Sequence, residues 1–178
     1  MTDTAVEPRF CDAGLTTPLG MVWLARSALG LCRVGIGLTE QSWRALAESE
    51  LGELPTRDDA ALAEALAALR AYFTQGSRQA LPADLPLDLS RGTAFQQRVW
   101  RAARRIPYGQ TRTYGQLARE MGAPGASRAV GQALHRNPVP IFVPCHRIVA
   151  SGGAGGFALG LNVKRALLDI EGVTLAED

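Results

Sequence analysis

Residues 78–90 interrupt the chain and divide it into two parts with different sequence patterns. This stretch contains two prolines and lacks helical periodicity, and we therefore predict a linker. Three alternating leucines, from Leu85 to Leu89, leave room in it for one short strand. The parts on either side, residues 1–77 and 91–178, are each long enough to form a small domain with a core of its own.

The N-terminal part combines strand and helix patterns. Two apolar runs, residues 21–25 and 31–36, flank a Gly-containing turn and predict a β-hairpin. Helices are expected near residues 41–49 and from about 58 to 74, and two aspartates stand at the positive end of the second helix. We therefore expect an α/β domain in which helices accompany a small antiparallel sheet.

The C-terminal part has the pattern of a mostly helical domain. Thr93 is placed to cap a helix that runs to Ile106, and residues 113–121 form a shorter helix. After a Gly-containing turn, Ser127 is placed to cap a third helix, and Asn162 is placed to cap a last one. Two short helices across a four-residue turn form a helix-turn-helix pattern. The sequence thus predicts a winged-helix-like domain with a helix-turn-helix.

Charge is distributed unevenly between the two parts. Residues 1–90 hold 7 Arg against 12 Asp and Glu, a balance of −5. Residues 91–178 hold 12 Arg and Lys against 5 acids, a balance of +7. A basic half joined to an acidic half indicates a polyanionic partner for the basic half. A solvated basic face is the alternative, and charge alone would favour that alternative.

The chain is poor in residues that bind metals or form disulfides. It has three widely separated cysteines and two histidines, His135 and His146, so we expect no disulfide framework, no zinc site and no cofactor. Its first seven residues include acids and no apolar core, and no stretch is as long as a membrane-spanning helix. We therefore expect a cytoplasmic monomer with no membrane contact and no obligate protein partner.

Cys145 and His146 are the candidate reactive residues. A thiol reacts as the thiolate and needs a base or positive surroundings, which His146 and Arg147 could supply. Adjacent side chains on an extended segment point to opposite faces, so contact between them requires a turn or a bridging water. Glu171 or Asp169 could orient the imidazole, as in catalytic triads. The alternative is a buried, inert cysteine, which is our interpretation of the other two cysteines.

Five segments of the C-terminal half carry a recognisable set of motifs, and the most specific is residues 137–149, which contain Pro144-Cys145-His146-Arg147. This segment resembles the active-site signature of the O6-alkylguanine-DNA alkyltransferase family. The family's other motifs have counterparts, in the same order and with natural spacing, at residues 91–100, 113–118, 128–131 and 164–172. The resemblance implies a DNA-repair enzyme, a methylated-DNA–protein-cysteine S-methyltransferase. Such an enzyme transfers the alkyl group of O6-alkylguanine in duplex DNA, irreversibly and once per molecule, to its own cysteine. Activity on O4-alkylthymine is left open.

The resemblance also implies roles for individual residues. Cys145 would be the nucleophile, His146 would take its proton through water, and Glu171 would hold His146. Asn137 would brace the turn before the site, and Tyr114 would donate a hydrogen bond to the departing guanine. The helix-turn-helix would enter the minor groove and the damaged base would flip out of the duplex. DNA contacts would come from Arg128, which would fill the gap left by the base, and from Tyr114, Gly115, Gln96, Ala123 and Ser151. The base pocket would be lined by Pro140, Ile148, Phe157, Ala158 and Leu159.

The chain departs from the family pattern in one loop. Residues 153–161 form a stretch about one residue shorter than usual, and Leu159 replaces a small residue, which affects how large an alkyl group could enter. Relatives that do not transfer alkyl groups carry Trp where this chain has Cys145, which favours transfer. Two other functions stay open: a DNA-binding module without transfer, and a cysteine hydrolase that uses Cys145 and His146.

Overall fold

The computed structural model describes residues 9–74 and 81–174. The chain folds as two compact units, Met1–Ala67 with Leu85–Asp88 and Ala68–Asp84 with Leu89–Asp178. The first three residues of the predicted linker lie outside the described residues, and the rest of it is shared between the two units. The domain boundaries expected at residues 77 and 91 therefore stay a prediction.

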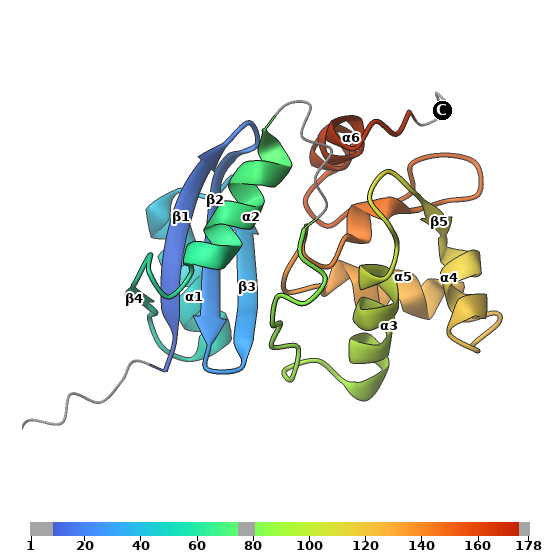
Figure 1. Ribbon diagram of the computed structural model, residues 1–178. Helices are drawn as coiled ribbons and strands as arrows, with labels where there is room; N and C mark the ends of the chain where they lie inside the picture. Colours follow the sequence, from blue (N-terminus) through green and yellow to red (C-terminus); the bar gives the residue numbers. More distant parts are fainter. Residues whose placement is uncertain (1–8, 75–80, 175–178) are drawn as a thin grey trace, which may run out of the picture. The chain divides into compact units, whose positions relative to one another are not determined.

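The first unit contains a four-stranded sheet with the order β3-β2-β1-β4. Strands β1 (Cys11–Thr17), β2 (Gly20–Ser27) and β3 (Gly30–Ile36) are antiparallel, and β4 (Thr56–Arg57) pairs in parallel with β1. The predicted hairpin is thus confirmed as β2 and β3 (Figure 1). The alternating leucines contribute a single bridge, between Leu31 and Leu87, rather than a full strand.

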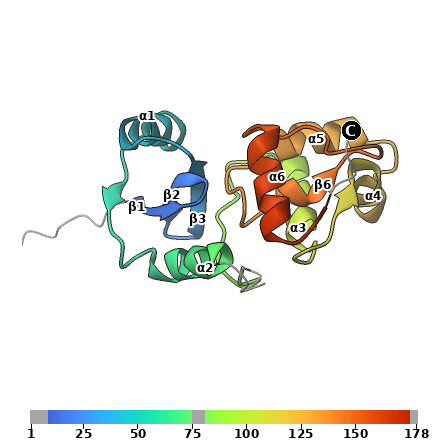
Figure 2. The ribbon, with the colours of Figure 1, turned by 90° about the horizontal axis from the view of Figure 1, so that it is seen from above.

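Helices lie on both faces of this sheet. Helix α1 (Glu40–Leu51) covers one face and the beginning of α2 (Ala63–Phe73) covers the other (Figure 2). Trp23 of β2 and Trp43 of α1 stack with ring centroids 6.3 Å apart, at the centre of the core on the α1 side. The prediction that the second helix begins near residue 58 was wrong, because Asp58 accepts a hydrogen bond from the Ala61 amide (3.0 Å) and closes a turn instead.

The second unit is mostly helical, as predicted. It consists of α3 (Ala94–Arg104), β5 (Arg112–Thr113), α4 (Tyr114–Glu120), α5 (Ser127–His135), a 3₁₀ turn (Cys145–Arg147), β6 (Ile148–Val149) and α6 (Leu161–Ile170). Helices α4 and α5 form the predicted helix-turn-helix. Strands β5 and β6 pair in parallel, which brings the start of α4 beside the segment that follows the 3₁₀ turn.

One of the three predicted helix caps, Thr93, is confirmed, and Thr113 is a further cap that was not predicted. Thr93 and Thr113 each accept a hydrogen bond from the amide three residues ahead, and a glutamine there returns the bond in a capping box. Ser127 and Asn162 do not cap, so those predictions were wrong. Ser127 is the first residue of α5, and its hydroxyl lies near Gly115 of α4. Helix α6 begins one residue before Asn162, after Gly160 in a left-handed conformation (φ 91°). Within the described residues, no helix combines the length and apolar character needed to cross a membrane.

Candidate active site

Cys145 lies on the 3₁₀ turn that follows a buried apolar segment. Residues 139–144 are buried, as predicted, and the turn is closed by hydrogen bonds from the Cys145 amide to Val143 O (2.8 Å) and from the Arg147 amide to Pro144 O (3.0 Å). The thiol is itself buried and lines a cavity of about 290 Å³. The turn takes the two neighbouring side chains, Cys145 and His146, out of the strict alternation of a strand.

Asn137 braces this turn and also contacts the thiol. Its Nδ2 donates to Val143 O (2.8 Å) and to Cys145 Sγ (3.1 Å), while its Oδ1 accepts from the Val139 amide (3.1 Å). One side chain therefore fixes the backbone on both sides of the apolar segment and orients the sulfur.

His146 is held by Glu171 and not by Asp169, the other carboxylate considered. His146 Nε2 lies 2.8 Å from Glu171 Oε1, and both side chains are fully buried, whereas Asp169 is exposed. His146 Nδ1 has no hydrogen-bond partner among the described residues. Within the described residues, no hydrogen bond joins the imidazole of His146 to the thiol of Cys145, so a proton would have to pass between the two side chains through water.

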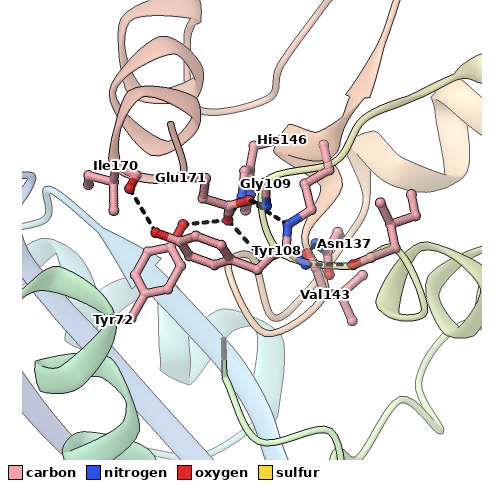
Figure 3. Close-up of polar contacts among 10 residues, drawn as sticks. Tyr72, Tyr108, Gly109, Asn137, Val143, His146, Ile170 and Glu171 are labelled. Atoms are coloured by element: carbon pink, nitrogen blue, oxygen red, sulfur yellow. Dashed lines mark hydrogen bonds and ion pairs between the residues drawn. The ribbon is translucent and has the colours of Figure 1, made fainter. Parts of the chain in front are cut away.

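Glu171 is the centre of a buried polar cluster that the sequence did not reveal. Arg147 binds the carboxylate with two nitrogens, Nε to Oε2 and Nη2 to Oε1, both at 2.8 Å. The Tyr72 hydroxyl donates to Oε1 (2.8 Å), and the Gly109 amide donates to Oε2 (3.0 Å). Figure 3 shows Tyr72, Gly109 and His146 around the Glu171 side chain. We call Tyr72, Gly109, His146, Arg147 and Glu171 the Glu171 cluster.

The expected role of Arg147 changes in this arrangement. The sequence suggested that Arg147 supplies positive charge to the thiol, but its guanidinium pairs with Glu171 and donates from Nη1 to Ile106 O (2.6 Å). A bidentate arginine keeps a buried carboxylate ionised. Although burial acts to raise the pKa of Glu171, the hydrogen bonds from His146 and Arg147 hold it at about 2.

The electrostatics fix the tautomer of His146. Burial lowers the pKa of its imidazole, against the opposing effect of Glu171, so the ring is neutral near pH 7. A neutral imidazole carries one proton, and the ionised carboxylate at Nε2 can only accept. The proton therefore lies on Nε2, and Nδ1 presents a bare lone pair that can accept a proton.

Burial raises the pKa of the Cys145 thiol to about 11. Asn137, the backbone amides of the 3₁₀ turn and the charge of Lys164 act in the opposite direction. These groups stabilise the thiolate once it forms, but a base is needed to form it.

Lys164 is a site residue that we did not predict as one. Its ammonium is fully buried and donates to the carbonyls of Ile148 (2.5 Å), Ala154 (2.5 Å) and Gly156 (3.3 Å). Burial lowers its pKa to about 8. The signal was present in the sequence, because Lys164 lies three and four residues before Leu167 and Leu168 and so shares the apolar face of α6.

The cavity in front of Cys145 is lined by parts of α4, α5 and the loop before α6. Tyr114 lines it and donates from its hydroxyl to Gly156 O (3.1 Å), and Phe157 and Ala158, two of the residues expected in the base pocket, also line it. Pro140, Ile148 and Leu159 are not among its lining residues; Ile148 and Pro140 are buried, and Leu159 is 37% exposed. The remaining lining residues were not predicted: Gly131, Gln132, Leu134, His135 and Gly156.

The residues expected at the DNA backbone are spread over the second unit. Arg128 is exposed in the first turn of α5, and Ser151 is exposed in the loop after β6. Gly115 lies in the first turn of α4 and Ala123 in the turn between α4 and α5, and both are half-buried; Gln96 is engaged in the capping box of α3. Tyr114, Gly115, Ala123 and Arg128 belong to the helix-turn-helix, whereas Gln96 and Ser151 lie outside it.

Comparison with known proteins extends over both halves of the chain. The family described as 6-O-methylguanine DNA methyltransferase, DNA binding domain, matches residues 94–173. The methylated-DNA–protein-cysteine methyltransferase of Mycobacterium bovis is 52% identical over 117 residues, which are 65% of this chain and 68% of that protein. The corresponding protein of Mycobacterium leprae is 44% identical over 158 residues, 88% of this chain and 89% of the relative.

A solved structure is similar over most of its length. The crystal structure of Mycobacterium tuberculosis OGT in complex with DNA has 42% sequence identity and a TM-score of 0.74, and the match covers 90% of this chain and 91% of that chain. The similarity thus reaches well beyond the residues that the family description matches.

Proposed function

Because this chain belongs to the methylated-DNA–protein-cysteine methyltransferase family, we propose that it repairs alkylated DNA by direct alkyl transfer. The alkyl group, methyl in the simplest case, moves from O6 of guanine in duplex DNA to Cys145. The observation that carries the proposal is the pairing of a cavity-lining thiol with a neutral imidazole whose Nδ1 is unengaged and whose Nε2 is held by Glu171.

The reaction is a displacement at the alkyl carbon. His146 Nδ1 takes the thiol proton of Cys145 through an intervening water, and the sulfur forms a bond to the alkyl carbon while the bond from that carbon to O6 breaks. The electron pair of that bond leaves with guanine, and Tyr114 donates a hydrogen bond to the departing base. The thioether has no route back to a thiol, so each molecule acts once.

Duplex DNA is the substrate of the C-terminal half, residues 91–178. Its net charge of +7 suits a phosphate backbone, and α4 and α5 provide the helix-turn-helix. The thiol is buried, so a base must leave the stack to reach it. Arg128, exposed at the start of α5, fills the space that the base leaves.

Incubation with a duplex that contains O6-methylguanine, followed by intact-mass measurement, tests the proposal. The expected result is one added methyl group per chain on Cys145 and an unmodified guanine in the DNA. Cys145→Ser should abolish transfer while DNA binding persists, and Cys11→Ser, outside the site, should leave transfer intact. An unchanged protein mass with an intact lesion would overturn alkyl transfer and leave a binding module. Turnover of a thioester or amide by the same thiol would favour a hydrolase.

The flipping step has a separate test. Arg128→Ala should slow transfer from duplex DNA much more than transfer from free O6-methylguanine base, because only the duplex requires a base to be replaced in the stack. Equal losses on both substrates would contradict this role of Arg128.

A further inference from the structure

The Tyr72 hydroxyl contacts the oxygen of Glu171 that also holds the catalytic base. Tyr72 lies in the last turn of α2 and is 1% exposed. Its hydroxyl donates to Glu171 Oε1 at 2.8 Å, and His146 Nε2 lies 2.8 Å from the same oxygen. Tyr72 and Glu171 are 99 positions apart in the chain, and no motif of the C-terminal half includes Tyr72.

We propose that Tyr72 is a positioning residue for alkyl transfer, whose hydroxyl holds the Glu171 carboxylate and limits the basicity of His146. The proposal rests on the proposed function for its catalytic consequence, but the effect on His146 itself does not depend on that function. Tyr72 acts through Glu171 and touches neither the thiol nor the base pocket.

The Tyr72 hydroxyl influences His146 because both groups bind the same oxygen, Glu171 Oε1. A carboxylate oxygen offers about two lone-pair directions, yet Oε1 receives the Tyr72 hydroxyl, His146 Nε2 and Arg147 Nη2, whereas Oε2 receives two donors. Each donor draws negative charge from the oxygen and weakens the attraction available to the others. The Tyr72 hydroxyl therefore reduces the stabilisation that Oε1 gives to a protonated His146.

Tyr72 is a permanent donor in this position. Burial and the nearby negative charge of Glu171 both raise the pKa of its phenol well above the usual range, so the hydroxyl keeps its proton wherever the protein is folded. The other charged groups that act on His146 are Glu171, Arg147 and Lys164. All three belong to the segment from the 3₁₀ turn to Glu171, the residue that follows α6, so Tyr72 is the contribution from α2.

The ring of Tyr72 is held independently of its hydroxyl. It packs edge-on against Phe73 (centroids 5.2 Å apart) and Tyr108 (6.1 Å). Tyr72→Phe therefore removes the hydrogen bond and keeps the packing. Tyr108→Phe is a matched control, because the Tyr108 hydroxyl donates to a backbone carbonyl, Ile170 O (2.7 Å), and not to the carboxylate.

The titration of His146, followed by NMR of the imidazole, tests the proposal directly. The chain has only two histidines, so a His135→Gln background leaves one imidazole signal. In Tyr72→Phe we expect His146 to titrate about 0.5–1 pH unit higher than in the parent, the scale of one hydrogen bond to a charged group. Tyr108→Phe should leave the titration unchanged. An unchanged titration in Tyr72→Phe would overturn the proposal, whatever happens to the melting temperature.

Two further measurements complete the test. The acid limb of the pH profile of single-turnover methyl transfer should move in the same direction, which lowers the rate about 3- to 10-fold on that limb. If the wild-type protein transfers no methyl group, the proposed function fails while the NMR titration still decides the role of Tyr72. Difluorotyrosine at position 72, a stronger donor of the same shape, should shift the His146 titration to lower pH. A shift in the opposite direction would overturn the proposal, also if Tyr72→Phe does not fold.

Discussion

Replacing Glu171 with Gln removes one negative charge from the centre of the Glu171 cluster and changes little in shape. The amide offers one acceptor oxygen in place of two, so its NH2 group must face donors: Arg147 Nε and the Gly109 amide, or the three donors at Oε1. Holding a glutamate near pKa 2 instead of its ordinary value of 4.5 contributes roughly 3 kcal/mol to stability at neutral pH. Loss of one partner of a buried ion pair costs about 3–5 kcal/mol.

We therefore expect Glu171→Gln to lower the free energy of unfolding in urea by about 3–5 kcal/mol at pH 7. The native pKa of Glu171 is depressed, so its contribution is present above pH 4.5 and is lost as the pH falls from 4.5 towards 2. The difference in the free energy of unfolding between wild type and variant should therefore disappear as the pH falls from 4.5 towards 2. Methyl transfer should slow by at least about a hundredfold, because the neutral amide no longer stabilises the imidazolium that forms when His146 takes the thiol proton. Asp169→Asn, which removes an exposed acid two residues earlier in the last turn of α6, is the matched control. A difference in the free energy of unfolding below about 1 kcal/mol at pH 7, or a difference that does not depend on pH, would refute the reasoning.

Three further substitutions probe the groups around the thiol. Gly155 has φ +69°, and a Cβ there would lie 2.9 Å from a backbone nitrogen and 3.1 Å from the Tyr114 ring. Gly155→Ala should therefore lower the free energy of unfolding in urea by about 1–3 kcal/mol. The control Gly152→Ala should lower it far less, because a Cβ at Gly152 meets open space. Lys164→Met leaves three carbonyls without their donor. We expect the free energy of unfolding to fall by at least about 2 kcal/mol, and backbone hydrogen exchange in the loop after β6 to become faster. Unchanged exchange would contradict this. Asn137→Ala removes a hydrogen bond that lowers the thiol pKa, so iodoacetamide should label the thiol more slowly at pH 8; equal or faster labelling would show that Asn137 does not stabilise the thiolate.

Local features of the fold could be predicted because local interactions determine them. Thr93 and Thr113 are each followed three residues later by glutamine, and both capping boxes form. The hairpin of β2 and β3 was found from its apolar runs. Strand β1 was missed because it contains Asp12, a residue type that is rare in a sheet core. Asp12 is buried there because Trp43 Nε1 donates to its carboxylate at 2.7 Å, a contact that no short-range pattern encodes.

The predicted site residues and the unpredicted ones differ in the same way. Cys145, His146 and Asn137 lie within one short motif, and the structure brings them together. Tyr72 and Gly109 contact Glu171 from distant parts of the chain. Only correlated substitutions at these positions among related sequences could have indicated the contacts, and a single sequence does not contain that information. Three predicted pocket residues do not line the cavity, because a resemblance gives the order of residues along a loop but not the path of its backbone.

Helix α5 carries both ends of the proposed flipping step. Arg128 lies in its first turn, and Leu134 and His135 in its last turn line the cavity in front of Cys145. Six residues separate Arg128 from Leu134, about 9 Å of rise along a helix, and Gly131 between them lies against the Tyr114 ring. A regular helix fixes these spacings, so the residue that enters the base stack and the wall that receives the base cannot move independently. Under the proposed function, DNA that seats Arg128 also sets the cavity at one distance from the duplex, which limits the reaction to a nucleotide displaced from the position that Arg128 fills.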